Sequence, residues 1–215
     1  MTAGNSETPD PPNPFRPREI ALAAGTRMHR VYDNRYATLE FNPGPKGAGR
    51  FHFFGEPTVP VLYAAETKEA AVAETLLRNI PVAGGLLAYG DYKSKVMAAF
   101  TSRREIRLAS FLGSGLRTLR VEARQLTDTP GESYPQTRKW AEAAHGAGYE
   151  GIAWMSRRNN SDRAYMFFGD RLTSGDFEVV PGSGRIFALG PGHDWLIDLC
   201  SPMHIDVMPV PALSP

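Results

Sequence analysis

The carboxylate best placed for chemistry in this sequence is that of Glu74, in a segment expected to form a helix over about residues 68–80. Thr67 is a suitable N-cap for that helix. At about 100° per residue, one apolar stripe forms from Ala70, Ala73, Leu76, Leu77 and Ile80. Glu74 falls at the edge of this stripe, where a carboxylate can border a cleft and serve in acid–base or electrostatic catalysis. The alternative is a surface ion pair, because Arg78 follows Glu74 by four residues.

The Gly-rich stretch before Arg50 does not encode a phosphate-binding loop. Residues 44–51 read G-P-K-G-A-G-R-F, whereas a P-loop needs Lys and then Ser or Thr after its second Gly. The spacing of the dinucleotide-binding glycines is missing as well. By its motif alone, this stretch is predicted to be a flexible connector.

The motifs do not support a nucleophilic serine or a metal site. Ser156 lies in Trp-Met-Ser-Arg-Arg, which is not a nucleophile elbow, and no acidic–histidine pair presents itself as its partner. The five histidines lack the spacing of metal ligands, so we expect no metal. The single cysteine, Cys200, excludes an intrachain disulfide. Arg157 follows directly after an expected strand, which favours a role for it beyond a solvated face.

The composition is that of a globular protein with no electrostatic preference for nucleic acid. The chain has 215 residues, 42% of them hydrophobic, and a formal net charge of +1. This balance argues against direct nucleic-acid binding and against attraction to an anionic membrane. No stretch approaches the roughly 18 apolar residues that span a bilayer, and the N-terminus has no signal-peptide pattern. We therefore expect a cytoplasmic protein that holds any anionic ligand through a few local arginines.

The chain divides into three parts by composition. Residues 1–18 contain five prolines and are expected to form a flexible tail, residues 19–175 the main domain, and residues 176–215 a C-terminal extension that packs on it. Strands are expected over 27–32, 59–64, 151–155 and 164–168, with two more between 96 and 111, and a helix over 134–146. The short runs 177–180, 185–189 and 195–199 also read as strands. Together these elements predict an α+β class.

Four blocks and one longer succession of segments, in order along the sequence, resemble the RES-domain family, which is named for its Arg, Glu and Ser. In the first half these are His29-Arg-Val-Tyr32, Gly49-Arg50-Phe51, Val61-Leu-Tyr-Ala-Ala65 and Ala70-Ala-Val-Ala-Glu74. In the second half, Tyr134-Pro-Gln-Thr137 leads into Trp140-Ala-Glu-Ala-Ala144, Gly148-Tyr-Glu-Gly-Ile-Ala-Trp154 and Met155-Ser-Arg157. The likeness covers roughly residues 27–170, so that residues 19–175 would be the RES catalytic domain.

The resemblance implies an ADP-ribosyltransferase-like fold, with two small, mostly antiparallel sheets, flanking helices and a central NAD cleft. It also implies a toxin of a toxin–antitoxin pair that cleaves the nicotinamide–ribose bond of NAD. The acceptor would be water, in a glycohydrolase, or inorganic phosphate, in a phosphorylase. NAD would be the substrate, with no cofactor, and the expected partner is a helix-turn-helix antitoxin that occludes the cleft.

The resemblance further implies a role for each of five residues. Glu74 would stabilise the oxocarbenium-like ribose and position the nucleophile, with Arg30 and Ser156 as further catalytic residues. Arg30 and Arg50 would bind the pyrophosphate, and Tyr63 would stack on the nicotinamide or the ribose. Ser156 would form a hydrogen bond with the ribose or with the nicotinamide amide.

Two alternative functions stay open. One is mono-ADP-ribosyl transfer to a host protein, and the other is a non-catalytic module that binds a nucleotide or a partner. Many arginine-directed ADP-ribosyltransferases carry a second Glu two residues before the catalytic one, where this chain has Val72. That difference favours water or inorganic phosphate over a protein side chain as the acceptor.

Overall fold

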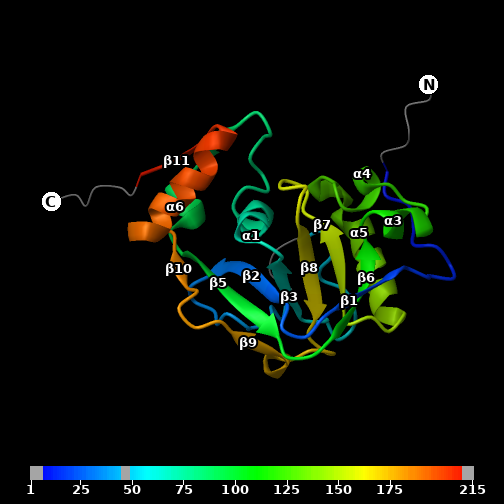
Figure 1. Ribbon diagram of the computed structural model, residues 1–215. Helices are drawn as coiled ribbons and strands as arrows, with labels where there is room; N and C mark the ends of the chain where they lie inside the picture. Colours follow the sequence, from blue (N-terminus) through cyan, green and yellow to red (C-terminus); the bar gives the residue numbers. More distant parts are fainter. Residues whose placement is uncertain (1–6, 45–48, 210–215) are drawn as a thin grey trace.

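One large sheet forms the body of the protein in the computed structural model, which describes residues 7–44 and 49–209 (Figure 1). Its strands are β1 (Glu19–Leu22), β2 (Arg27–Asp33), β3 (Val61–Ala65), β5 (Lys95–Ser102), β6 (Ile106–Phe111), β7 (Gly151–Met155), β8 (Arg163–Phe168), β9 (Phe177–Val179) and β10 (Arg185–Ile186). The helices are α1 (Lys68–Thr75), α2 (Tyr89–Tyr92), α3 (Ser114–Thr118), α4 (Ala123–Leu126), α5 (Tyr134–Gly146) and α6 (Gly190–Cys200), with short 3-10 turns at Gly131–Ser133, Ser174–Asp176 and Ser201–Met203. Within the described ranges, no helix has the length and apolar character needed to cross a membrane.

The strands of the large sheet run in the order β1-β6-β7-β8-β3-β2-β5-β10, and β9 pairs with β5. Neighbouring strands are antiparallel except for β6 and β7, which run parallel. Helices α1, α5 and α6 flank this sheet (Figure 1). The mostly antiparallel sheet and its helices confirm the predicted α+β class.

The large sheet is nearly divided between β2 and β3. These strands pair only at His29 and Ala65, whereas β2 pairs with β5 over seven residues and β3 with β8 over five. Farther along β3, Asn42 pairs with Val61 in place of β2. The two sheets expected from the resemblance are therefore two halves of one sheet, joined at a single paired position.

The helix that carries Glu74 begins as predicted and ends early. Thr67 Oγ1 accepts a hydrogen bond of 3.1 Å from the backbone N–H of Ala70, which confirms the N-cap. Helix α1 stops at Thr75 instead of continuing to residue 80. Glu74 therefore lies in the last turn of α1, and α1 packs against β2, β3 and β8.

The C-terminal segment contains a helix where the sequence predicted a strand. The run 195–199 belongs to α6, whose buried residues Gly192, Leu196 and Cys200 recur every four positions, as on one face of a helix. Strand β10 is likewise limited to two residues of the expected run 185–189. Helix α6 packs against β11 (Ile205–Val207), which pairs in parallel with β4 (Gly85–Leu87) as a separate two-stranded sheet.

The N-terminal segment is extended, as its prolines predict, but its described part packs on the domain. Trp140 Nε1 donates a hydrogen bond of 2.8 Å to the carbonyl of Pro9, and Thr8 is buried. The Phe15 ring lies edge-on to the rings of Phe111 and Trp140. The expectation that order begins near residue 19 is thus wrong for residues 7–18, because an indole N–H and an apolar ring anchor this stretch. Residues 1–6 of the expected tail, 45–48 of the Gly-rich stretch and 210–215 of the expected extension lie outside the described residues.

Candidate active site

A large pocket opens where β2 and β3 part. Its volume is about 840 Å³, within the usual range for a site that encloses a small molecule. Strands β2 and β3 and helix α1 contribute to its walls, together with Gly49, Arg50, His52, Trp154, Arg157 and Arg158. Of the described residues that line it, six are basic and three are acidic, namely Arg30, Arg50, Arg78, Lys95, Arg157 and Arg158 against Asp33, Glu40 and Glu74. The nearly neutral chain thus gathers local positive charge at this pocket, which suits an anionic ligand.

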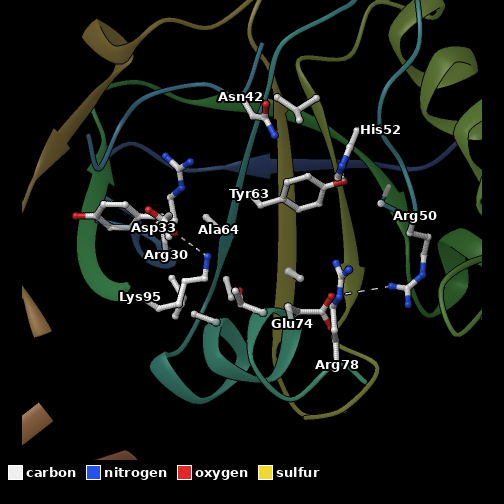
Figure 2. Close-up of a pocket in the computed structure, with 18 of the residues that line it drawn as sticks. Arg30, Asp33, Asn42, Arg50, His52, Tyr63, Ala64, Glu74, Arg78 and Lys95 are labelled. Atoms are coloured by element: carbon white, nitrogen blue, oxygen red, sulfur yellow. Dashed lines mark hydrogen bonds and ion pairs between the residues drawn. The ribbon is translucent and has the colours of Figure 1, made fainter. Parts of the chain in front are cut away.

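The Glu74 carboxylate is fixed on one side and faces an arginine on the other. Its Oε1 accepts a hydrogen bond of 2.7 Å from the Ser156 hydroxyl and one of 3.1 Å from the backbone N–H of Arg157. Its Oε2 lies 4.0 Å from Arg50 Nη1, across the pocket (Figure 2). Two donors to one oxygen hold the carboxylate in a single orientation and leave the other oxygen available to a ligand.

The alternative ion pair between Glu74 and Arg78 is not what the structure shows. Helix α1 ends at Thr75, so the helical spacing that would bring the two side chains together is lost before Arg78. Among the described residues, the ion pair of Glu74 is with Arg50. Arg78 is exposed and lines the pocket beside Glu74 (Figure 2).

Arg50 is a buried cation with an unused donor. Only 11% of its side chain is exposed, and its Nε is buried without a hydrogen-bond partner among the described residues. The Thr137 hydroxyl donates a hydrogen bond to the backbone carbonyl of Arg50, which ties this residue to α5. A buried donor without a partner is costly. Arg50 also lines the pocket with Nη1 facing Glu74, so it is suited to bind an anionic group through its Nη donors.

Tyr63 and His52 form a hydrogen-bonded pair in the pocket wall. Tyr63 Oη lies 2.7 Å from His52 Nδ1 (Figure 2). Burial lowers the pKa of His52 to about 4, so its imidazole is neutral near pH 7, and burial raises the pKa of Tyr63. The buried indole of Trp154 supports Tyr63 edge-on, at 6.0 Å between ring centroids. A side chain at Gly49 would overlap the His52 ring, so Gly49 lets this ring fold back over the chain.

Arg30 lies in the pocket, but its guanidinium holds neighbouring backbone. Its Nη1 donates to the carbonyls of Thr38, at 2.6 Å, and Glu40, at 2.8 Å, and its guanidinium carbon lies 5.4 Å from the centre of the Tyr32 ring. Burial lowers the pKa of Arg30 to about 10, which leaves the group charged at neutral pH. Arg30 therefore fixes the segment around residues 38–40 that borders the pocket.

Ser156 orients Glu74 from within the protein core. The residue is fully buried and does not line the pocket, and its hydroxyl is donated to Glu74. The structure thus brings Glu74, Arg50 and Ser156 together, whereas the expected contact of Ser156 with a ligand does not fit its burial.

Two contributors to the site, His52 and the backbone N–H of Arg157, escaped the sequence analysis. His52 lies within an aromatic run and has no motif, and the backbone N–H of Arg157 carries no sequence signal. The Arg157 side chain forms an ion pair with Asp128 and donates a hydrogen bond of 3.3 Å to the Thr129 carbonyl, which fixes its position. The sequence analysis singled out this side chain for its position just after the strand 151–155. Within the described residues, no group of three or more His, Cys, Asp or Glu side chains could hold a metal ion.

Comparison with known proteins bears on both the fold and the family of the chain. A chain from the crystal structure of the M. tuberculosis MbcT-MbcA toxin-antitoxin complex is similar, with a TM-score of 0.56 and 11% sequence identity over 86% of this chain and 91% of that one. At this identity the likeness shows the fold alone. No curated protein sequence matches the chain. The model of the RES domain matches residues 24–187, which are most of the chain and include all five residues singled out from the sequence. The chain therefore belongs to the RES-domain family.

Proposed function

We propose that this protein cleaves the nicotinamide–ribose bond of NAD, and that it is the toxin of a toxin–antitoxin pair. The observation that carries the enzymatic part is the fixed Glu74 carboxylate, which has one oxygen held by two donors and the other turned to a cationic pocket. Such a preorganised charge stabilises positive charge that develops in a transition state.

The reaction breaks the bond between C1′ of the ribose and the nicotinamide nitrogen. The bonding electrons leave with nicotinamide, which departs as a neutral molecule, and positive charge develops on the ribose. Glu74 stabilises that charge and accepts a proton from the incoming water as the new C1′–O bond forms. The products are nicotinamide, ADP-ribose and a proton. With inorganic phosphate as acceptor, a phosphate oxygen forms the bond and the product is phosphorylated ADP-ribose.

The pocket supports a small acceptor. Val72 is fully buried in the core under α1, so the position two residues before Glu74 contributes no group to the pocket. We therefore place water or inorganic phosphate ahead of a protein side chain.

The toxin role rests on family and fold. The similar solved structure is that of a toxin–antitoxin complex, and an antitoxin for this chain would act by covering the pocket. We propose a helix-turn-helix antitoxin and a cytoplasmic site of action, as the sequence led us to expect.

The decisive experiment measures nicotinamide release from NAD by the purified protein, with and without inorganic phosphate. Glu74→Gln keeps the size of the side chain and removes its charge, and we expect it to lower turnover by about 10²–10⁴-fold. Exposed Glu69 lies on the same helix outside the pocket, so Glu69→Gln is the matched control and keeps full activity.

Each outcome has a distinct meaning. Release that needs phosphate identifies a phosphorylase, and release without phosphate identifies a glycohydrolase. Label transferred from NAD to a protein, with no free ribosyl product, identifies mono-ADP-ribosyl transfer instead. If the wild type releases no nicotinamide and labels no protein, the enzymatic proposal is wrong, and a non-catalytic binding module takes its place.

A further inference from the structure

A lysine on the wall opposite Arg50 points into the pocket. Asp33 of β2 and Lys95 of β5 are directly paired across the two strands, and Lys95 Nζ lies 3.3 Å from Asp33 Oδ2. Figure 2 shows the ammonium group between Asp33 and Glu74, on the side of the pocket that faces Arg50 and Arg78. The Lys95 side chain is 29% exposed, and Lys95 lines the pocket.

Asp33 does not need Lys95 to satisfy its carboxylate. Asp33 Oδ1 accepts hydrogen bonds from the Arg35 side chain, at 2.7 Å, and from the Arg35 backbone N–H, at 3.2 Å. Its Oδ2 accepts one of 2.8 Å from the Ser94 hydroxyl. The Arg35 hydrogen bond keeps the pKa of Asp33 well below its ordinary value, so this carboxylate stays charged. Asp33 therefore orients Lys95 and, because Arg35 already offsets its charge, leaves the ammonium as a net positive charge.

Lys95 has unused N–H donors, and its side chain lies on the same side of the sheet as Glu74. An ammonium group has three N–H donors, and among the described residues Lys95 Nζ uses one of them, for Asp33. Side chains alternate between the two faces of a strand. Asp33 and Lys95 share a face with Val31, which packs against α1. Lys95 thus faces the same space as Glu74.

Arg30 is less suited to this task. It lies on the opposite face of β2 by the same alternation, and its Nη1 already donates to two backbone carbonyls. The sequence predicts that Arg30 and Arg50 bind the pyrophosphate. On the wall formed by β2 and β5, Lys95 is the cation that remains free to bind an anion.

We propose that Lys95, oriented by Asp33, binds the diphosphate of the dinucleotide substrate. This assignment rests on the proposed function, which places the nicotinamide ribose at Glu74. The diphosphate follows that ribose in the substrate, and it would lie between Lys95 on one wall and Arg50 on the other. Each cation would form charge-assisted hydrogen bonds with phosphate oxygens.

The test uses ADP, which carries the adenosine and the diphosphate but has no bond for the enzyme to cleave. We would measure ADP binding to the full chain by calorimetry, beside adenosine as the uncharged probe. Lys95→Met keeps the apolar stem, and we expect it to weaken ADP binding by about tenfold or more while binding of adenosine stays unchanged. Lys93 is exposed and outside the pocket, so Lys93→Met is the matched control and binds ADP as the wild type does.

Turnover gives a second readout. Lys95→Met should raise the KM for NAD about tenfold and leave kcat within about twofold, because the diphosphate contact is the same in the ground state and in the transition state. Lys95→Gln and thermal unfolding of both variants exclude a folding defect. Unchanged ADP binding and unchanged KM in both variants overturn the assignment, even if Glu74-dependent cleavage of NAD is observed. If ADP binding needs Lys95 but NAD is not cleaved, the binding assignment holds and the proposed reaction fails.

Discussion

The Ser156 hydroxyl donates a hydrogen bond of 2.7 Å to Glu74 Oε1. This contact joins the residue that follows β7 to the last turn of α1, and it leaves Ser156 with no exposed surface. Two of the three residue types that give the family its name thus act on each other. Arg50 faces the second oxygen of the same carboxylate, so Ser156 acts through Glu74 as a positioning residue.

Ser156→Ala is expected to lower kcat for nicotinamide release by about 10–100-fold and to leave the KM for NAD within about twofold. The reason is that Glu74 loses one of the two donors that fix its orientation. The free energy of unfolding should fall by about 1–2 kcal/mol, because a buried hydrogen bond is lost. Exposed Ser161 is the control, as Ser161→Ala should change neither quantity. A raised KM with an unchanged kcat would instead assign Ser156 to ligand contact.

Arg30→Met is expected to loosen the segment that borders the pocket. The substitution removes the hydrogen bonds to the Thr38 and Glu40 carbonyls, so amide hydrogen exchange over residues 37–42 should become at least about tenfold faster. Activity should fall with it, since one wall of the pocket becomes mobile. Arg27→Met, at an exposed position of the same strand, is the control. If exchange stays at the wild-type rate while the KM rises, Arg30 binds substrate directly.

The free energy of unfolding is expected to decrease between about pH 6.5 and pH 4. Burial lowers the pKa values of His29 and His52 to about 4, below the value of 6.5 of an unperturbed histidine. In this interval the unfolded chain binds protons that the native protein does not bind, so acidification favours unfolding. Stability from these two groups is complete above pH 6.5 and is lost as the pH falls.

Urea unfolding at a series of pH values measures this dependence. His52→Asn keeps an acceptor near Tyr63 and removes the imidazole, so the slope of stability against pH should fall by about half. Exposed His204 has a left-handed backbone conformation that Asn tolerates, and His204→Asn should follow the wild-type curve. An equal slope in the His52 variant would show that this imidazole titrates in the native state as it does in the unfolded chain.

Local patterns predicted the helix start and most strands. The N-cap at Thr67, the helix over 134–146 and the strand 151–155 depend on neighbouring residues, and the structure has them at the same places. By contrast, the run 195–199 is a helix, because four apolar residues in a run of five do not distinguish the two periodicities. The anchoring of residues 7–18 was also missed, since it depends on the distant indole of Trp140.

The sequence predicted several residues of the site but not the contacts that join them. Glu74 was identified from its position at the edge of an apolar stripe, but its partner Ser156 lies 82 residues away, and only the fold brings them together. Lys95 faces the pocket because β2 and β5 pair in one register, which no local pattern specifies. His52 has no sequence motif, and its place in the site follows only from the structure, where its ring lies against Gly49.

The order of strands in the sheet also determines when the site can assemble as the chain is synthesised on the ribosome. Strand β3 holds its place between β2 and β8, and Glu74 is fixed by groups that follow β7. A nascent chain that has reached α5 already contains Arg30, Arg50, Tyr63, Glu74 and Lys95, yet it lacks the strands that align them. The site is therefore not assembled on the ribosome until β7 and β8 have emerged, and premature termination anywhere before Ser156 yields a fragment in which Glu74 is not held in place.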